Sequence, residues 1–184
     1  MTTKKITIAG MCLALCMLLP FLTGQIPQIG NALSPMHIPV LLCGFVCGGG
    51  YGAMIGFIAP ILRSLLLNSP PLFPTATAMA FELATYGFAS GILYRLLSKK
   101  TIHIYSSLIG AMLIGRIIWG VTRFIMAVLF DVEFTLNMFL SGAFIIAIPA
   151  IICHIILIPI IVIVLKNAGF MSGEKKTRVH IEQN

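Results

Sequence analysis

Long apolar runs, separated by short polar segments, make up most of the chain. An apolar run of about 20 residues predicts a transmembrane helix, because the hydrocarbon core of a bilayer is about 30 Å thick. The run from His37 to Leu67 is too long for one such span, and its glycine-rich middle, Gly48 to Gly52, signals a turn. The pattern therefore predicts six helices, at about residues 6–23, 38–48, 51–67, 75–97, 105–130 and 136–165.

Composition narrows the class of protein further. Of the 184 residues, 59% are hydrophobic and only 9% are charged, whereas about 25% are charged in an ordinary soluble domain. A soluble domain of this size cannot bury so much apolar surface. We therefore expect an all-α integral membrane protein in which residues 1–184 form a single transmembrane domain.

The placement of charge predicts the orientation in the membrane. The net charge is +7, and nine of the 12 basic residues flank apolar runs rather than forming the basic face that nucleic acid requires. Basic residues mark cytoplasmic ends, so both termini are expected inside, with a cytoplasmic tail at 166–184. The flanking residues are Lys4, Lys5, Arg95, Lys99, Lys100, Lys166, Lys175, Lys176 and Arg178.

Metal, disulfide and nucleotide chemistry receive no support from motifs. All five cysteines lie within apolar runs, and the two C-x3-C pairs have the i, i+4 spacing of a helix rather than the spacing of zinc ligands. We expect free thiols, no metal and no cofactor. The sequence holds no Walker-type phosphate-binding loop, so any uphill transport would draw on an ion gradient or on a separate subunit.

Four ionisable residues lie inside the predicted spans: Arg63, Glu82, Arg116 and Arg123. Each costs about 2.5–3.5 kcal/mol at the centre of a membrane helix. We expect them to converge on a cavity that opens outward. Pairing of Glu82 with one arginine is the structural alternative, but three arginines exceed one glutamate. The surplus favours an anionic ligand, most simply a carboxylate held by arginine.

Further site candidates surround these charges. Trp119 lies between Arg116 and Arg123 on one face of the fifth helix, because the spacings are i, i+3 and i+7. Tyr86, one turn from Glu82, either lines the same cavity or packs in the core. Asn137 either caps the sixth helix or contacts ligand.

Two histidines have open roles. His37, just before the second helix, belongs either to a lid over the ligand or to a solvated loop. His154, in the inner half of the sixth helix, is expected to form an interhelical hydrogen bond.

Small residues spaced four apart mark surfaces where another helix can pack closely. Gly10 and Ala14 form such a pair in the first helix, and Gly52 and Gly56 form another in the third. Packing within the protein is the default interpretation of these pairs.

The chain resembles the S components, or substrate-specific subunits, of energy-coupling-factor (ECF) vitamin transporters. The resemblance rests on chain length, on six helices and on the stretch HIPVLLCGFVCGGGYGAMIGFIAPILRSLL from His37 to Leu67. In this stretch an Ile-Pro pair at 38–39 begins a helix, a glycine turn follows at 48–52, and Gly-x3-Gly opens the next helix. The segment FELATYG at 81–87 looks similar to pantothenate-type members.

The resemblance implies a function and partners. An S component captures a water-soluble vitamin outside the plasma membrane of a prokaryote and has no ATPase activity. It joins a transmembrane coupling protein and two cytoplasmic ATPase subunits, and it is expected to topple in the membrane to release its ligand inside. Gly10 and Ala14 look similar to the small-residue motif that contacts the coupling protein in this family.

Two other classes of protein remain as alternatives. An ion-coupled secondary transporter of a small organic anion would move substrate without partners. An intramembrane enzyme would need a nucleophile with a base, or a carboxylate cluster for metal. Glu82 is the only acidic residue within a predicted span, and neither HExxH nor GxSxG occurs, so we expect no enzyme.

Overall fold

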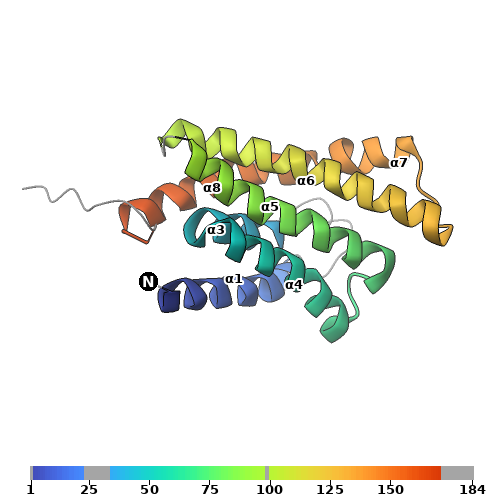
Figure 1. Cartoon of the computed structure of the whole chain (residues 1–184), viewed down its shortest axis with the longest axis horizontal. Coiled ribbons are helices and arrows are strands. Elements are labelled where there is room, and N and C mark those ends of the chain that lie inside the picture. The colour runs from blue at the N-terminus through green and yellow to red at the C-terminus, as the bar shows by residue number, and fades with distance from the viewer. Residues whose placement is uncertain (1, 23–33, 98–99, 171–184) are drawn as a thin grey trace, which may run out of the picture.

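The computed structural model describes residues 2–22, 34–97 and 100–170, which form a bundle of helices without strands (Figure 1). This confirms the predicted fold class of an all-α membrane bundle with six main helices. The main helices are α1 (Thr2–Leu22), α3 (His37–Cys47), α4 (Gly49–Leu67), α5 (Thr77–Leu96), α6 (Thr101–Phe130) and α8 (Ile148–Asn167).

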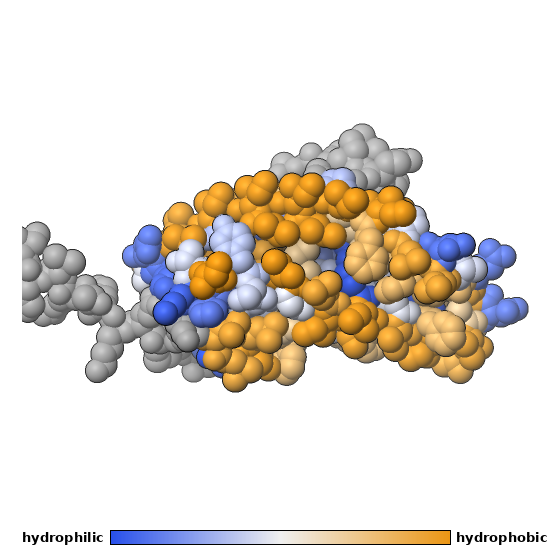
Figure 2. Space-filling model, turned by 90° about the horizontal axis from the view of Figure 1, so that it is seen from above, coloured by the Kyte–Doolittle hydropathy of each residue, from blue (hydrophilic) through white to orange (hydrophobic). Residues whose placement is uncertain are grey.

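Apolar surface surrounds most of the bundle. Four helical stretches are long and apolar enough to cross a membrane by length and composition. Figure 2 shows a broad hydrophobic band along the bundle, with hydrophilic residues toward its two ends and a smaller hydrophilic patch in a gap in the band. The four stretches are Thr3–Phe21, Gly49–Leu67, Thr101–Phe130 and Leu136–Asn167.

Helix α3 is too short to cross a membrane. Its 11 residues span about 16 Å at 1.5 Å per residue, which is roughly half of the hydrocarbon core. Gly48 joins it to α4 in a single-residue turn, with a φ of 102° that glycine adopts without a steric penalty. Helix α3 ends at this turn near one end of the bundle (Figure 1). Its first residue, His37, is buried, with 3% of its surface exposed.

Glycine brings the backbones of α3, α4 and α5 into direct contact. A Cβ atom on Gly87 of α5 would overlap the backbone of Gly52 on α4, and one on Gly56 would overlap the backbone of Leu83. Gly44 of α3 likewise lies against the backbone of Gly87. The small-residue spacing at Gly52 and Gly56 therefore serves packing within the protein.

The stretch predicted as one helix at 136–165 is interrupted. It contains α7 (Leu136–Leu140), a π-helical turn η2 (Ser141–Ile145) and then α8, which begins at Ile148. Pro149 occupies the first turn of α8, where its missing N–H costs no helical hydrogen bond. Pro149 thus lies where a new helix begins rather than inside a continuous one. A second π-helical turn, η1 (Leu72–Ala76), precedes α5.

Basic residues gather at one end of the bundle. The Lys4 ammonium lies 4.6 Å from the ring centroid of Phe170, which places the start of α1 beside the end of α8. The end of α5 and the start of α6 lie at the same end of the bundle (Figure 1). Residues 171–184 of the predicted cytoplasmic tail, and residues 23–33 between the first two predicted helices, lie outside the described residues.

Candidate functional site

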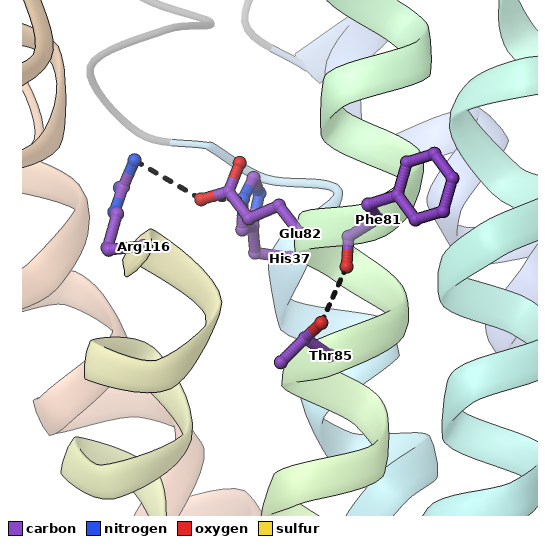
Figure 3. Close-up of polar contacts among 5 residues, drawn as sticks. All are labelled: His37, Phe81, Glu82, Thr85 and Arg116. Carbon is purple, nitrogen blue, oxygen red and sulfur yellow. Dashed lines mark hydrogen bonds and ion pairs between the residues drawn. The ribbon is translucent and has the colours of Figure 1, made fainter. Parts of the chain in front are cut away.

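Glu82 is the centre of a buried polar cluster in the middle of the bundle. It lies in the second turn of α5, and only 2% of its surface is exposed. Its Oε1 atom lies 3.3 Å from Nη1 of Arg116 on α6 and 3.7 Å from Nε2 of His37 on α3 (Figure 3). The pairing of Glu82 with an arginine, left open by the sequence, is therefore present.

Two further side chains complete this polar cluster. The ring of His37 contacts Tyr86 of α5 at a centroid distance of 5.3 Å and His154 of α8 at 5.9 Å. His37, Tyr86 and His154 are all at least 97% buried. We call these five residues the inner cluster: His37, Glu82, Tyr86, Arg116 and His154.

Several buried polar atoms of the inner cluster make no well-aligned hydrogen bond among the described residues, although Glu82 lies close to His37, Tyr86 and Arg116. These atoms are Nδ1 and Nε2 of His37, Oε1 of Glu82, the hydroxyl of Tyr86, Nε of Arg116 and Nε2 of His154. An unsatisfied buried polar group costs about 1–3 kcal/mol. Folded proteins leave few such groups unsatisfied, so a concentration of them at one level of the bundle makes this level the candidate site. The ring of His154 is meanwhile fixed by a hydrogen bond with the backbone of Ser34.

An aromatic and cationic group lies farther along the same face of α6. The indole of Trp119 stacks near Phe139 at a centroid distance of 6.1 Å and meets Phe134 edge-on at 5.8 Å. The guanidinium of Arg123 lies 5.3 Å from the centroid of Phe134. We call these four residues the outer group: Trp119, Arg123, Phe134 and Phe139. The stretch 131–140 thus folds back over the end of α6.

Two glycines of α6 explain how its neighbours come so close. A Cβ atom on Gly115 would overlap the ring of Tyr86, and one on Gly120 would overlap the ring of Phe139. Both are small residues on the face that carries Arg116 and the outer group. This face of α6 therefore contacts α5 in its inner part and α7 in its outer part.

The structure separates Arg63 from these two groups and leaves Asn137 exposed. Arg63 is buried against α1, where its Nη1 donates a hydrogen bond to the carbonyl of Met17 at 3.0 Å and its guanidinium lies 5.4 Å from the ring centroid of Phe21. Asn137 is exposed on α7, and the hydroxyl of Thr135 accepts the capping hydrogen bond of that helix. Their predicted contact with ligand stays a prediction.

The sequence predicts only part of these two groups. It indicates Glu82, Tyr86, Arg116, Trp119 and Arg123 as site candidates, and the structure brings these residues together along one face of α6. It left His37 between a lid and a solvated loop, whereas His37 is 3% exposed at the centre of the bundle. The burial of His37 could have been predicted from the apolar run before Gly48. This run is too short to cross the membrane, so the helix that ends at Gly48 must begin inside the bundle. Phe134 and Phe139 carried no local signal.

The outward surface of α1 carries the predicted coupling pair. Gly10 and Ala14 are both exposed, and a Cβ atom on Gly10 would meet nothing within 4 Å. They are not used for packing among the described residues. The opposite side of α1 holds Cys12 and Cys16, which face α3 as part of the apolar core.

The cysteines are free thiols, as the sequence predicts. Cys12 contacts Cys43 across the α1–α3 interface, and all five cysteines are unpaired. No group of histidine, cysteine or acidic side chains in the described part of the chain could hold a metal ion.

Comparison with protein families gives one match. The family described as the ECF transporter substrate-specific component matches residues 4–166, a range that includes both groups of the candidate site. The comparisons with curated proteins and with solved structures give no match. Members of the matching family are membrane subunits of transporters rather than enzymes. The chain therefore belongs to the ECF transporter substrate-specific components and is a substrate-binding membrane subunit of an ECF importer.

Proposed function

We propose that this chain captures a small anionic vitamin from outside the cell and passes it to an ATP-driven module. Pantothenate is the first candidate ligand. The observation that carries the proposal is the inner cluster, whose buried polar atoms lack hydrogen-bond partners among the described residues. A polar ligand that binds there would satisfy several of them at once.

Charge supports an anionic ligand. Arg116 is balanced by Glu82 at 3.3 Å, and Arg63 interacts with the backbone and an aromatic ring of α1. Arg123 forms no ion pair with any acidic side chain that the structure describes. Its positive charge is therefore available to a carboxylate, which guanidinium binds through two parallel hydrogen bonds.

The outward face of α1 supports docking of a coupling protein. Gly10 and Ala14 present backbone without bulk at an exposed surface, which allows a partner helix to approach closely. The chain holds no phosphate-binding loop of the Walker type, so ATP hydrolysis belongs to the partner subunits.

Purification from the native membrane tests this proposal. The chain should co-purify with a transmembrane coupling protein and two ATPases. Replacement of Gly10 or Ala14 by leucine should weaken that association while ligand affinity stays nearly unchanged, because these positions are exposed on α1, which contributes no residue to the inner cluster. The matched control is Met11→Leu, which changes an exposed apolar side chain on the same helix without filling the small-residue surface.

Two results would overturn the proposal. One is recovery of the chain without a coupling protein or ATPases under conditions that preserve membrane complexes. The other is an equal loss of ligand binding and assembly in Gly10→Leu. This result would mean that the exposed surface of α1 does not serve docking of the coupling protein independently of ligand binding.

A further inference from the structure

We propose that Cys12 and Cys43 form a redox-modification site, which a neutral disulfide dissolved in the membrane oxidises to a reversible disulfide bond between them. This bond joins α1 covalently to α3. The inference follows from the placement of cysteines along the α1–α3 interface, and it does not depend on which ligand the chain binds.

Four of the five cysteines lie along the interface between α1 and α3. Cys12 and Cys16 come from α1, and Cys43 and Cys47 come from α3. Each is at most 8% exposed, and all four belong to one apolar cluster. A cysteine packs like a small apolar residue, so packing alone does not require a thiol at all four positions. The reactivity of the thiols is what distinguishes this interface.

The thiols toward the two ends of the interface bond to backbone on the opposite helix. The Sγ atom of Cys16 donates a hydrogen bond to the carbonyl of Met36 at 3.6 Å. The Sγ atom of Cys47 donates one to the carbonyl of Lys5, also at 3.6 Å. These two contacts fix the register of α1 against α3, and Cys12 and Cys43 lie between them along the two helices.

Cys12 and Cys43 already meet through their side chains, which form a hydrogen bond across the interface. Cys43 also contacts Cys47, four residues along the same helix. Helix positions four apart have Cβ atoms about 5–6 Å apart, whereas a disulfide bond needs a Cβ separation of about 3.5–4.5 Å. A bond between Cys43 and Cys47 would therefore distort α3. The facing pair of Cys12 and Cys43 avoids this cost.

The position of α1 gives a neutral oxidant access to this pair from the lipid. Helix α1 lies at one edge of the bundle (Figure 1). Its outward side chains are exposed, including Met11 at 62% and Leu18 at 61%. Cys12 is the neighbour of Met11 and, at 8%, the most exposed of the four thiols. An uncharged disulfide that dissolves in hydrocarbon can approach Cys12 along this edge.

The reaction is thiol–disulfide exchange, and 2,2′-dithiodipyridine serves as the neutral disulfide. The thiolate of Cys12 attacks one sulfur of the reagent, the reagent's S–S bond breaks, and the first thiopyridone leaves with the proton lost by Cys12. The thiolate of Cys43 then attacks the Cys12 sulfur in the mixed disulfide, and the second thiopyridone leaves with the proton lost by Cys43. The two cysteines lose two electrons, which reduce the reagent's S–S bond.

Treatment of the purified chain in detergent with 2,2′-dithiodipyridine tests the proposal. Cyanogen bromide cleaves after methionine and so releases residues 12–17 and 37–54 as separate fragments. After oxidation, mass spectrometry should find these two fragments joined, and dithiothreitol should separate them. The melting temperature of the oxidised chain should rise by about 5 °C or more, because the bond closes a loop in the unfolded chain.

Matched alanine variants identify the two sulfurs. Cys12→Ala should abolish the joined fragments and the rise in melting temperature. Cys16→Ala is its control, because it removes another buried thiol of α1 that faces α3, and it should preserve both. Cys47→Ala should preserve both as well. Each variant is first checked by size-exclusion chromatography, and Cys43→Ala carries the test if Cys12→Ala does not fold.

Four results would overturn the inference. The first is separate fragments in the folded wild-type chain after oxidation. The second is joined fragments that persist in Cys12→Ala or in Cys43→Ala. The third is loss of the joined fragments in a folded Cys16→Ala or Cys47→Ala variant, and the fourth is joined fragments without a rise in melting temperature.

Discussion

Two faces of α5 show opposite uses of the same helix. Toward α3 and α4, Gly87 meets Gly44 and Gly52 so closely that their backbones touch. Toward α6 and α3, Glu82 and Tyr86 are buried with polar atoms that lack hydrogen-bond partners among the described residues. On one face the helix backbones are in direct contact. On the other face, buried polar groups can still form hydrogen bonds with a ligand.

The difference shows how a small membrane protein can hold such a site in place. Unsatisfied polar groups cost stability, and a site that must hold them in position needs a rigid support. The glycine interface supplies that support, since backbone contact fixes the position of α5 relative to α3 and α4. The same helix then presents Glu82 and Tyr86 to α6 at a defined depth.

The largest effect should follow from breaking the glycine interface. Gly87→Leu would force the α4 and α5 backbones apart, because even a Cβ atom there overlaps Gly52. Overpacking of a close-packed core usually costs about 1–3 kcal/mol for one or two methylene groups, so a whole leucine should prevent recovery of folded protein. Gly50→Leu is the matched control, because a Cβ at Gly50 meets nothing within 4 Å.

Thermal unfolding in detergent and size-exclusion chromatography measure this difference. Gly50→Leu should elute and unfold like the wild-type chain. Equal behaviour of the two variants would show that the glycine interface is not what holds α5.

An intermediate effect should follow from removal of the arginine in the inner cluster. Arg116→Ala leaves Glu82 without its partner at 3.3 Å, and we expect ligand affinity to fall by about 2–5 kcal/mol, the usual cost of removing one partner from a buried charged contact. Calorimetry with pantothenate measures the loss. The double variant Glu82→Gln, Arg116→Gln should recover thermal stability but not affinity, because it removes the buried charge and the contact together.

Recovery of affinity in the double variant would contradict this account. It would mean that the pair serves folding alone and that the ligand binds elsewhere.

The smallest effect should come from the Tyr86 hydroxyl. Tyr86→Phe removes one unpartnered buried polar atom without a change in ring packing against Gly115. We expect stability to stay the same or to rise slightly, and affinity to fall by about 1 kcal/mol, the net value of one hydrogen bond. A fall in melting temperature with unchanged affinity would instead assign Tyr86 to the core.

The sequence predicts the architecture well, because apolar runs determine the helices and glycine residues determine the turn and the close helix contacts. Six helices follow from the apolar runs, and the turn at Gly48 follows from a residue that tolerates positive φ. The depth of Glu82 and Arg116 follows from their positions within long spans. Their approach to within 3.3 Å was an open alternative that the structure resolves.

Side-chain direction and loop folding were beyond the sequence. Residue position gives depth in the membrane but not the neighbour that a side chain meets, so the sequence predicts Arg63 beside Glu82 although Arg63 contacts α1. Phe134 and Phe139 reach Trp119 only because the stretch after α6 folds back. The burial of His37 follows from the length of α3, which spans only part of the membrane.

Uptake of radiolabelled pantothenate into liposomes tests the central claim most directly. The isolated chain should bind pantothenate but accumulate none inside under a proton or sodium gradient. The chain reconstituted with its coupling protein and ATPases should accumulate pantothenate only when ATP is supplied on the ATPase side. Gradient-driven accumulation by the chain alone, or no ATP-dependent uptake by the complete assembly, would contradict the account.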